Sequence, residues 1–297
     1  MKHVFIINPV AGKKDSERLV PMIKNYFKNT DDYQIIITEE KGHAQKIASS
    51  FTNDDDVCVY GIGGDGTAFE ILNGINEGVA MAVIPNGTGN DYFKMIKYTA
   101  QSVEETLLAT IEGRSVKVDY GMANDVRYLN SSSMGLDADV NLLANKIGSK
   151  YPIPRSLVYI VAALITVIKP HPIVIKMTLD DQVLTSKALL IAVMNGKFYG
   201  GGFLPTPDAD IQDGMLDVCV VKDMRLRRIL KLLPQYFKGK HVGLPEVDFY
   251  RSTSVTLITD NPVMYGCDGE TNTASMIEYK LIKDGLTLRV PKKSSLK

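Results

Sequence analysis

The stretch that decides the fold is Val57-Cys58-Val59-Tyr60-Gly61-Ile62-Gly63-Gly64-Asp65-Gly66-Thr67, in which an apolar run gives way to closely spaced glycines. The run Val57–Tyr60 is typical of a buried β-strand, and residues 67–75 favour a helix. A strand, a loop and a helix in this order form one βα unit of a parallel sheet. Glycines let backbone N–H groups approach a phosphate, and a helix N-terminus adds partial positive charge. The segment therefore predicts a phosphate-binding loop at the edge of a parallel sheet.

The same pattern recurs on either side of this segment. Three more short β-rich runs are separated by stretches with helical spacing: Val4–Ile7, Tyr33–Thr38 and Ala80–Pro85. Asp15 or Ser16 can cap the first of these helices. Two further loops follow such runs, at Asn8–Gly12 and Pro85–Asp91. Because ligands on parallel sheets bind beyond the carboxyl ends of the strands, we expect the three loops to share one edge of an α/β domain.

Two of these loops carry a carboxylate, at Asp65 and Asp91. An aspartate among glycines would repel phosphate unless it handles a proton or a metal ion, so Asp65 is either a mechanistic residue or a metal partner. In a purely structural interpretation, Gly63–Gly66 is a tight turn and Asp65 caps the helix. Three loops with two aspartates indicate a site for a triphosphate and magnesium.

Two commoner nucleotide sites are disfavoured. Gly61–Gly66 matches the dinucleotide-binding pattern G-x-G-x-x-G, but that pattern needs an acidic residue about 20 residues later. The next strand ends at Pro85-Asn86 without one, and the loop follows the third strand rather than the first. The chain also lacks G-x-x-x-x-G-K-[ST], which excludes a P-loop enzyme.

The pattern changes near residues 121–125, which predicts one domain over residues 1–122 and a second over 123–284. Strand-like runs then dominate, and helical patterns become sparse: Val116–Tyr120, Tyr128–Asn130, Ile173–Leu179, Val183–Asn195, Met215–Val221, Ser254–Thr259 and Ser275–Leu281. Asp180-Asp181 is expected to form a hairpin turn between two of them. The second domain is therefore predicted to be a mostly antiparallel sandwich or barrel.

Composition excludes several classes of protein. The length of 297 residues suggests two domains, at about 150 residues each. Lys plus Arg and Asp plus Glu both number 34, so the basic excess typical of nucleic-acid binders is missing. Cys58, Cys219 and Cys267 are too scattered for a disulfide framework or a zinc site, which favours a reducing cytoplasm. The longest apolar stretch, Leu157–Ile168, is shorter than the ~20 residues that span a bilayer.

Several motifs together resemble one enzyme family. They stand in this order: Asn8-Pro9 with Gly12; Gly63–Thr67 with Glu70 and Asn73-Gly74; Ile84–Asp91 (IPNGTGND); Asn195-Gly196; Gly200–Phe203; Pro207–Ala209; Asp213–Asp217; and Asp268-Gly269-Glu270. The chain is similar to the diacylglycerol-kinase catalytic family, and more narrowly to soluble bacterial lipid kinases related to diacylglycerol and sphingosine kinases. GGDGT alone is less specific, because NAD kinases and phosphofructokinase-like enzymes share it.

The resemblance implies an N-terminal α/β domain with an NAD-kinase/phosphofructokinase-like parallel sheet that binds ATP. A C-terminal, mainly antiparallel β-sandwich would take the lipid, with the active site in the cleft between the domains. The last strand, Leu286–Pro291, would return residues 285–297 to the first domain. The nucleotide contacts implied for this sequence are Asn8, Pro9, Val10, Ala11, Gly12, Thr38, Gly64, Asp65, Gly66, Thr67, Ala68, Phe69, Glu70, Thr88 and Asp91.

The resemblance also implies a metal site and a catalytic base. A structural magnesium would bind Asp210, Asp213 and the backbone carbonyl of Met215, since a hard cation prefers carboxylate and carbonyl oxygens. The general base would be Asp268 or Glu270, with Asp65 as a further catalytic candidate. In a purely structural interpretation, Asp268-Gly269 is an ordinary hairpin turn.

Two segments are candidates for contact with a lipid. Leu157–Ile168 is either a core helix or the lining of a groove for acyl chains. Met224–Phe237 has an apolar face, and Lys222–Lys240 holds seven Lys or Arg and one acid. We hypothesise that three of these cations steer docking onto anionic lipid: Arg225, Arg228 and Lys231. The alternative is a helix whose apolar face packs on the sandwich and whose basic face is solvated.

The leading functional prediction is an ATP- and Mg²⁺-dependent lipid kinase that phosphorylates the hydroxyl of diacylglycerol or a related lipid alcohol. The alternatives are an NAD kinase-like enzyme and a nucleotide-responsive lipid-binding module without turnover. We expect a cytoplasmic protein, peripheral on the inner membrane face, with no nucleic-acid partner, and compatible with a homo-oligomer. The sequence does not decide the acceptor lipid, the identity of the base, the oligomeric state, the membrane-docking surface or ATP against GTP.

Overall fold

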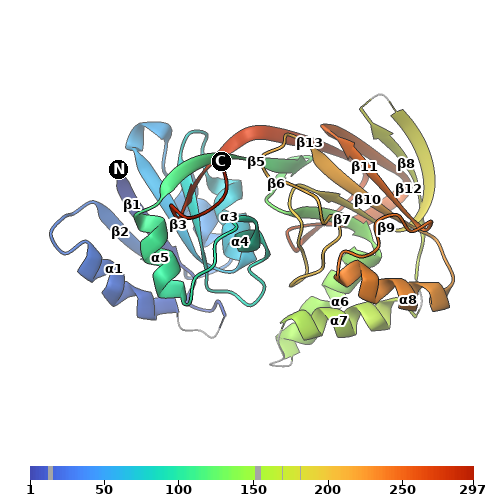
Figure 1. Cartoon of the computed structure of the whole chain (residues 1–297), viewed down its shortest axis with the longest axis horizontal. Helices are drawn as coiled ribbons and strands as arrows, with labels where there is room; N and C mark the ends of the chain where they lie inside the picture. Colours follow the sequence, from blue (N-terminus) through green and yellow to red (C-terminus); the bar gives the residue numbers. More distant parts are fainter. Residues whose placement is uncertain (13–15, 151–154, 169, 181) are drawn as a thin grey trace. The chain divides into compact units, whose positions relative to one another are not determined.

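The chain divides into two compact units, which a computed structural model describes over residues 1–12, 16–150, 155–168, 170–180 and 182–297 (Figure 1). Unit 1 consists of Met1–Asp119 and Lys283–Lys297, and unit 2 of Tyr120–Ile282. Two strands, β5 (Arg114–Ala123) and β13 (Glu270–Val290), run from one unit into the other. Asp15, a candidate helix cap, and Asp181, a candidate turn residue, lie outside the described residues.

Unit 1 is built on a parallel sheet. Its strands, β1 (Lys2–Ile7), β2 (Tyr33–Ile37), β3 (Val57–Gly63) and β4 (Ala80–Pro85), lie in the order β4-β3-β1-β2. The end of β13 adds a further parallel strand beside β4, with Thr287 paired to Ala80. All seven residues of β3 are buried, as is typical of a parallel strand covered on both faces.

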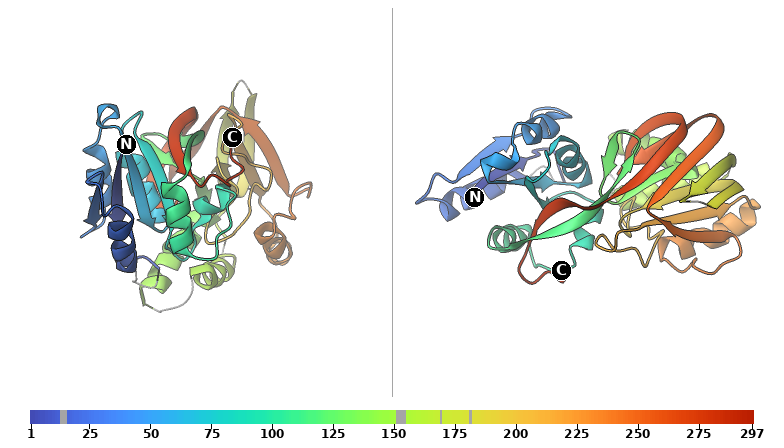
Figure 2. Two further views of the ribbon diagram at one scale, coloured as in Figure 1. Left: turned by 60° about the vertical axis from the view of Figure 1, so that its left-hand side comes forward. Right: turned by 90° about the horizontal axis from the view of Figure 1, so that it is seen from above.

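Helices cover both faces of this sheet, as the right-hand view of Figure 2 shows. On one face, α1 (Val20–Tyr26) and α5 (Val103–Ile111) pack against β1, β3 and β4 through a shared apolar cluster that includes Leu19, Ile23 and Phe27. The other helices are α2 (His43–Ser49), α3 (Asp65–Gly74) and α4 (Asp91–Met95). Two short 3₁₀ turns, Ser16–Leu19 and Asn53–Asp55, complete the unit.

Unit 2 is a mainly antiparallel β structure. Its strands are β6 (Val126–Tyr128), β7 (Ser131–Gly135), β8 (Ile173–Leu179), β9 (Gln182–Met194), β10 (Leu216–Lys222), β11 (Val247–Ser252), β12 (Ser254–Cys267) and the first part of β13. The long strands β9 and β12 pair with β8 along one part of their length and with β7 along another. The predicted fold class, α/β followed by an antiparallel β domain, is confirmed.

Unit 2 holds more helix than the sequence pattern predicts. Its helices are α6 (Leu136–Lys150), α7 (Arg155–Thr166) and α8 (Leu226–Phe237). They share an apolar cluster with β9, β10 and β11, and Figures 1 and 2 show them against these strands. The expectation of sparse helices is therefore wrong for α6 in particular. Among the described residues, no helix combines the length and the apolar character needed to cross a membrane.

Candidate active site

Three loops of unit 1 meet at the carboxyl ends of β1, β3 and β4. Gly12 has a φ of 59°, and a Cβ on it would lie 2.3 Å from the carbonyl oxygen of Asn86. A Cβ on Gly87 would lie 2.4 Å from the Cα of Gly64. Only glycine allows the backbones to approach so closely. The loops that the sequence placed on one edge are thus in direct contact.

Side chains hold this loop cluster in place. The Asn8 amide donates to the Thr67 hydroxyl at 3.1 Å, and its carbonyl oxygen accepts from the Val10 backbone N–H at 3.0 Å. The Asn86 backbone N–H donates to the Gly63 carbonyl at 2.8 Å. Helix α3 begins at Asp65, so its positive dipole end lies in the same cluster. Fixed backbone and a helix N-terminus suit an anion such as a phosphate chain.

The three carboxylates of this region have different surroundings. Asp65 accepts a hydrogen bond from the Tyr92 backbone N–H at 3.1 Å, which ties α3 to α4. Asp91 is buried and pairs with Lys94 at 2.6 Å. Glu70 points away from the loops, because its two oxygens accept from the N–H groups that begin α2, those of Gly42 and Ala44, at 2.9 and 3.2 Å. Glu70 therefore acts as a cap for α2 in this structure.

The other candidate nucleotide-binding residues differ in their solvent exposure. Thr38 follows β2 and donates its backbone N–H to the Ile7 carbonyl at 2.8 Å, so it lies beside the end of β1. Ala68 is buried in the core of unit 1, where its side chain serves packing. The remaining members are exposed or half-buried around the loops: Pro9, Val10, Ala11, Gly12, Gly64, Gly66, Phe69 and Thr88.

In unit 2, Asp268 and Glu270 have separate surroundings. Asp268 lies in the turn between β12 and β13 with a φ of 45°. Its carboxylate accepts three consecutive backbone N–H groups at 2.5 to 3.0 Å, those of Leu129, Asn130 and Ser131. Glu270 is half-buried and begins β13. Asp268 therefore fixes the segment that leads into β7, a role that the sequence did not predict.

The predicted magnesium ligands lie in the turn before β10. Asp213 accepts the Met215 backbone N–H at 3.0 Å, and its other oxygen forms a salt bridge with Arg251. Asp210 accepts the Gln212 backbone N–H at 3.1 Å. Across the described parts of the chain, no three His, Cys, Asp or Glu side chains group so as to hold a metal ion. Arg251 thus places a positive charge beside Asp213.

A further carboxylate beside this turn was missed from the sequence. Asp217 is buried in β10, and its carboxylate lies 3.3 Å from the Arg251 guanidinium. Burial raises the pKa of Asp217 to about 6, and the nearby Asp213 and Asp208 charges act in the same direction, while Arg251 opposes them. It is the last residue of the Asp213–Asp217 motif, but the motif gave it no role, since the residues that surround it come from other segments.

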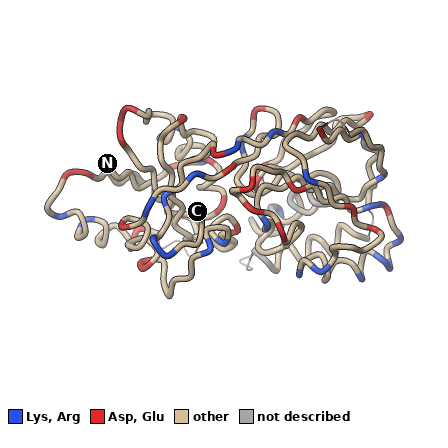
Figure 3. Tube along the Cα trace, turned by 45° about the horizontal axis from the view of Figure 1, so that its top comes forward, with Lys and Arg blue, Asp and Glu red and all other residues tan. Residues whose placement is uncertain are grey.

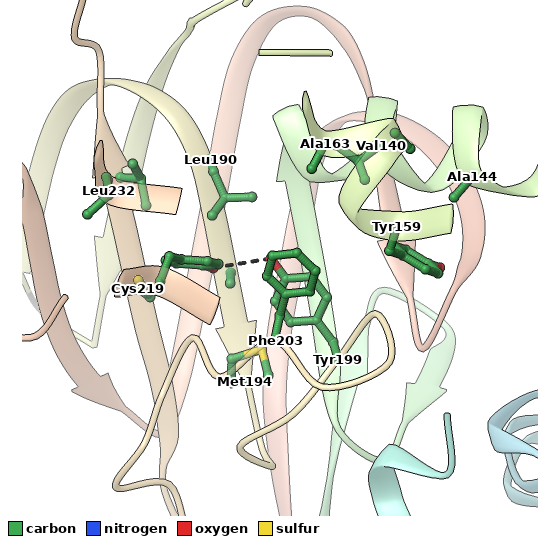
Figure 4. Packing of buried hydrophobic residues seen from close by; sticks show 14 of the residues in the cluster. Val140, Ala144, Tyr159, Ala163, Leu190, Met194, Tyr199, Phe203, Cys219 and Leu232 are labelled. Carbon is green, nitrogen blue, oxygen red and sulfur yellow. Dashed lines mark hydrogen bonds between the residues drawn. The ribbon is translucent and has the colours of Figure 1, made fainter. Parts of the chain in front are cut away.

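Unit 2 also contains an apolar cavity that opens to solvent, with a volume of about 60 Å³. The helices α6, α7 and α8 and the strands β9 and β10 form its wall (Figure 4). Tyr159, Phe203 and Leu232 are among the lining side chains. The Tyr199 and Tyr236 hydroxyls, which also line it, hydrogen-bond to each other at 3.2 Å. The apolar lining of this cavity suits a hydrocarbon group.

The comparisons with known proteins agree with this geometry. The model of the diacylglycerol kinase catalytic domain matches residues 2–123. The YegS C-terminal NAD kinase beta sandwich-like domain matches residues 130–288, more than half of the chain. The chain belongs to the diacylglycerol-kinase-like lipid kinases. The resemblance predicted from the motifs is confirmed, and with it the class of enzyme.

Individual relatives lie at moderate identity. The chain is 26% identical to a diacylglycerol kinase of Mycobacterium tuberculosis over 267 residues, which covers 86% of this chain and 84% of the relative. It is 26% identical to a diacylglycerol kinase of Staphylococcus saprophyticus over 278 residues, covering 90% and 88%. A crystal structure from Bacillus anthracis, described as a "putative diacylglycerol kinase", superposes with a TM-score of 0.78 at 26% identity and covers 97% of both chains.

Proposed function

We propose that this lipid kinase transfers the γ-phosphate of ATP, accompanied by Mg²⁺, to the hydroxyl of diacylglycerol or a related lipid alcohol. The observation that carries the proposal is the apolar cavity of unit 2, which suits a hydrocarbon chain of the acceptor. NAD, the acceptor of the rival kinase class, is a charged dinucleotide without a hydrocarbon chain. An apolar cavity therefore favours the lipid.

The phosphate donor would be bound by unit 1. The Asn8–Gly12, Gly64–Thr67 and Thr88 positions surround the start of α3, where N–H groups and the helix dipole favour a triphosphate. Asp65, half-buried at the first turn of α3, would orient the donor or its metal ion. Asp91 and Glu70 would stabilise the loops without contacting the donor. Asp91 does so through its ion pair with Lys94, and Glu70 through its hydrogen bonds to the start of α2.

The proton of the acceptor hydroxyl would go to Glu270. Hydrogen bonds that favour the charged form of a carboxylate lower its proton affinity and so weaken it as a general base. Asp268 is a weaker candidate, because its carboxylate already accepts three backbone hydrogen bonds that favour its charged form. We therefore propose Glu270 as the base and Asp268 as the positioning residue that fixes the neighbouring backbone.

Magnesium enters the proposal as the companion of the triphosphate. Phosphoryl transfer needs a cation to neutralise charge on the phosphates. The fit of a second, structural ion at Asp210, Asp213 and Met215 is poor, because Arg251 already supplies positive charge to Asp213. No step of the reaction is assigned to an ion at that turn.

The acceptor would reach unit 2 from a membrane. A lipid alcohol resides in a bilayer, so the enzyme works as a peripheral protein, and we propose the cytoplasmic face, where ATP is available.

The three cysteines of the chain are free and buried, and burial raises the pKa of Cys58 and Cys267 to about 12, so neither thiol is reactive.

The test is transfer of radiolabelled γ-phosphate from ATP with Mg²⁺ to mixed micelles that contain one lipid alcohol at a time, and in parallel to NAD. We expect label in the organic phase with diacylglycerol or a related lipid, and its loss in the Glu270→Gln variant. Label in NAD would move the protein to the rival class. Nucleotide binding by calorimetry without any transfer would indicate a lipid-binding module without turnover.

A further inference from the structure

Helix α7 exposes a row of large apolar side chains. Four of its residues and one residue just after its end, Ile168, follow helical spacing and are 44 to 62% exposed: Leu157, Val161, Leu164, Ile165 and Ile168. The opposite face of the same helix is buried against unit 2, through Tyr159, Ala162 and Ala163 among others. A surface helix of a globular protein normally presents polar residues to water. An outward apolar row of this length instead marks a surface that contacts something.

Helix α8 adds positive charge to this surface. Leu226 and Leu230 are 39 and 45% exposed, and three exposed cations lie between and beside them: Arg225, Arg227 and Lys231. None of these three cations has an ion-pair partner among the described residues. Arg228, by contrast, donates two hydrogen bonds to the Glu246 carboxylate, at 2.6 and 2.9 Å. Arg227 therefore replaces Arg228 in the set of cations that the sequence suggested.

The two helices are neighbours in unit 2. Val167, directly after α7, and Ile229 of α8 belong to one buried cluster, and residues of both helices line the apolar cavity. Figure 1 shows α7 and α8 together beneath the strands, and Figure 3 shows a group of basic positions at the corresponding lower right. The helices that carry the apolar row and the cations thus both line the same cavity through their buried faces.

We propose that the α7 row and the α8 cations form the surface by which this kinase docks onto an anionic bilayer, a proposal that rests on the lipid-kinase function. A bilayer with anionic headgroups would take the apolar side chains into its acyl boundary and pair with the cations. A second copy of the chain suits this surface less well, because a two-fold contact would bring like charges together. The acceptor's hydrocarbon chain would then pass from the bilayer into the cavity behind α7.

The test is sedimentation of the full-length protein with vesicles of phosphatidylcholine alone and with 30% phosphatidylglycerol. We expect binding to the anionic vesicles that weakens as salt is added. The triple variant R225E/R227E/K231E should lower the partition coefficient by about tenfold or more. The matched control, K176E/K280E/K283E, changes net charge equally at exposed lysines of β8 and β13 and should stay within about twofold of wild type.

The apolar row is tested by L164S/I165S, which should weaken binding to both vesicle types while circular dichroism stays unchanged. Equal binding by R225E/R227E/K231E and its control would overturn the proposal, as would wild-type protein that stays in the supernatant. A dimer in analytical ultracentrifugation that L164S/I165S converts to monomer, without vesicle binding, would assign the surface to self-association instead. Phosphate transfer in detergent micelles, measured on every variant, separates failure of docking from failure of the kinase function.

Discussion

At the scale of single residues, Asp268 and Glu270 stand two positions apart, yet their surroundings give them different tasks. Asp268 orders a backbone segment that lies 137 to 139 residues earlier in the chain. No local pattern could predict those partners, whereas the DGE motif itself indicated that one of the two carboxylates matters. The motif thus located the site, and the three-dimensional contacts divide the roles.

The first prediction separates these two roles. Asp268→Asn should lower the free energy of unfolding by about 2 kcal/mol, because the neutral amide weakens three charge-assisted hydrogen bonds. Glu270→Gln should leave stability nearly unchanged and lower kcat by ~10²–10⁴-fold, the usual contribution of a general base. Urea unfolding and micelle assays on both variants check this. A stable but inactive Asp268→Asn protein would argue that Asp268 is the base.

The second prediction concerns His3, which is packed against Phe27 and Tyr60 and whose Nδ1 lies 2.8 Å from the Tyr60 hydroxyl. Burial lowers the pKa of His3 to about 4, and the Arg289 and N-terminal charges act in the same direction. Between pH 6.5 and about 4 the unfolded chain therefore binds a proton that the fold does not, so stability falls as the pH drops. The free energies of unfolding of wild type and His3→Gln should diverge over this window, by on the order of 1–2 kcal/mol. If the free energies of unfolding of the two proteins change with pH in parallel, His3 is protonated in the folded state.

At the scale of elements, the strands and loops of unit 1 followed from local pattern, while two elements of unit 2 did not. β7 reads Ser-Ser-Ser-Met-Gly, yet Ser132 is fully buried and hydrogen-bonds the Tyr279 hydroxyl at 3.1 Å. α6 does place apolar residues at helical spacing, Leu136, Val140, Leu143 and Ile147, but the polar residues between them weaken the signal. β7 depends on neighbours distant in sequence, so tertiary contacts outweigh its local preference.

The third prediction concerns α7, which forms part of the wall of the cavity. Ala163 is buried and lines the cavity, so Ala163→Phe would fill part of its empty space. If the cavity holds an acyl chain, this variant should raise KM for a long-chain diacylglycerol several-fold more than for a dioctanoyl analogue. KM for ATP should stay unchanged, and stability should fall by no more than ~1–3 kcal/mol, the cost of overpacking. Equal effects on both chain lengths would place the acyl chain elsewhere.

At the scale of the whole molecule, both links between the units lie inside strands. β5 passes from unit 1 to unit 2 at residues 119–120, and β13 returns at 282–283. The family resemblance placed the return at residue 285, just before the expected last strand, Leu286–Pro291. A strand that belongs to two units cannot lose its pairing in one of them without fraying in the other. We therefore expect the units to unfold together.

The fourth prediction follows from this coupling. A ligand that binds only the folded state stabilises it by about 2.7 kcal/mol at a hundred times its Kd. A non-hydrolysable ATP analogue with Mg²⁺, which we propose to bind unit 1, should therefore raise the midpoint of one cooperative transition that includes unit 2. Calorimetry with and without the analogue measures this, and Gly12→Val is the control, since a Cβ there would meet the Asn86 carbonyl at 2.3 Å and distort the loop cluster. Two separate transitions, with only one shifted by nucleotide, would show that the shared strands do not couple the units.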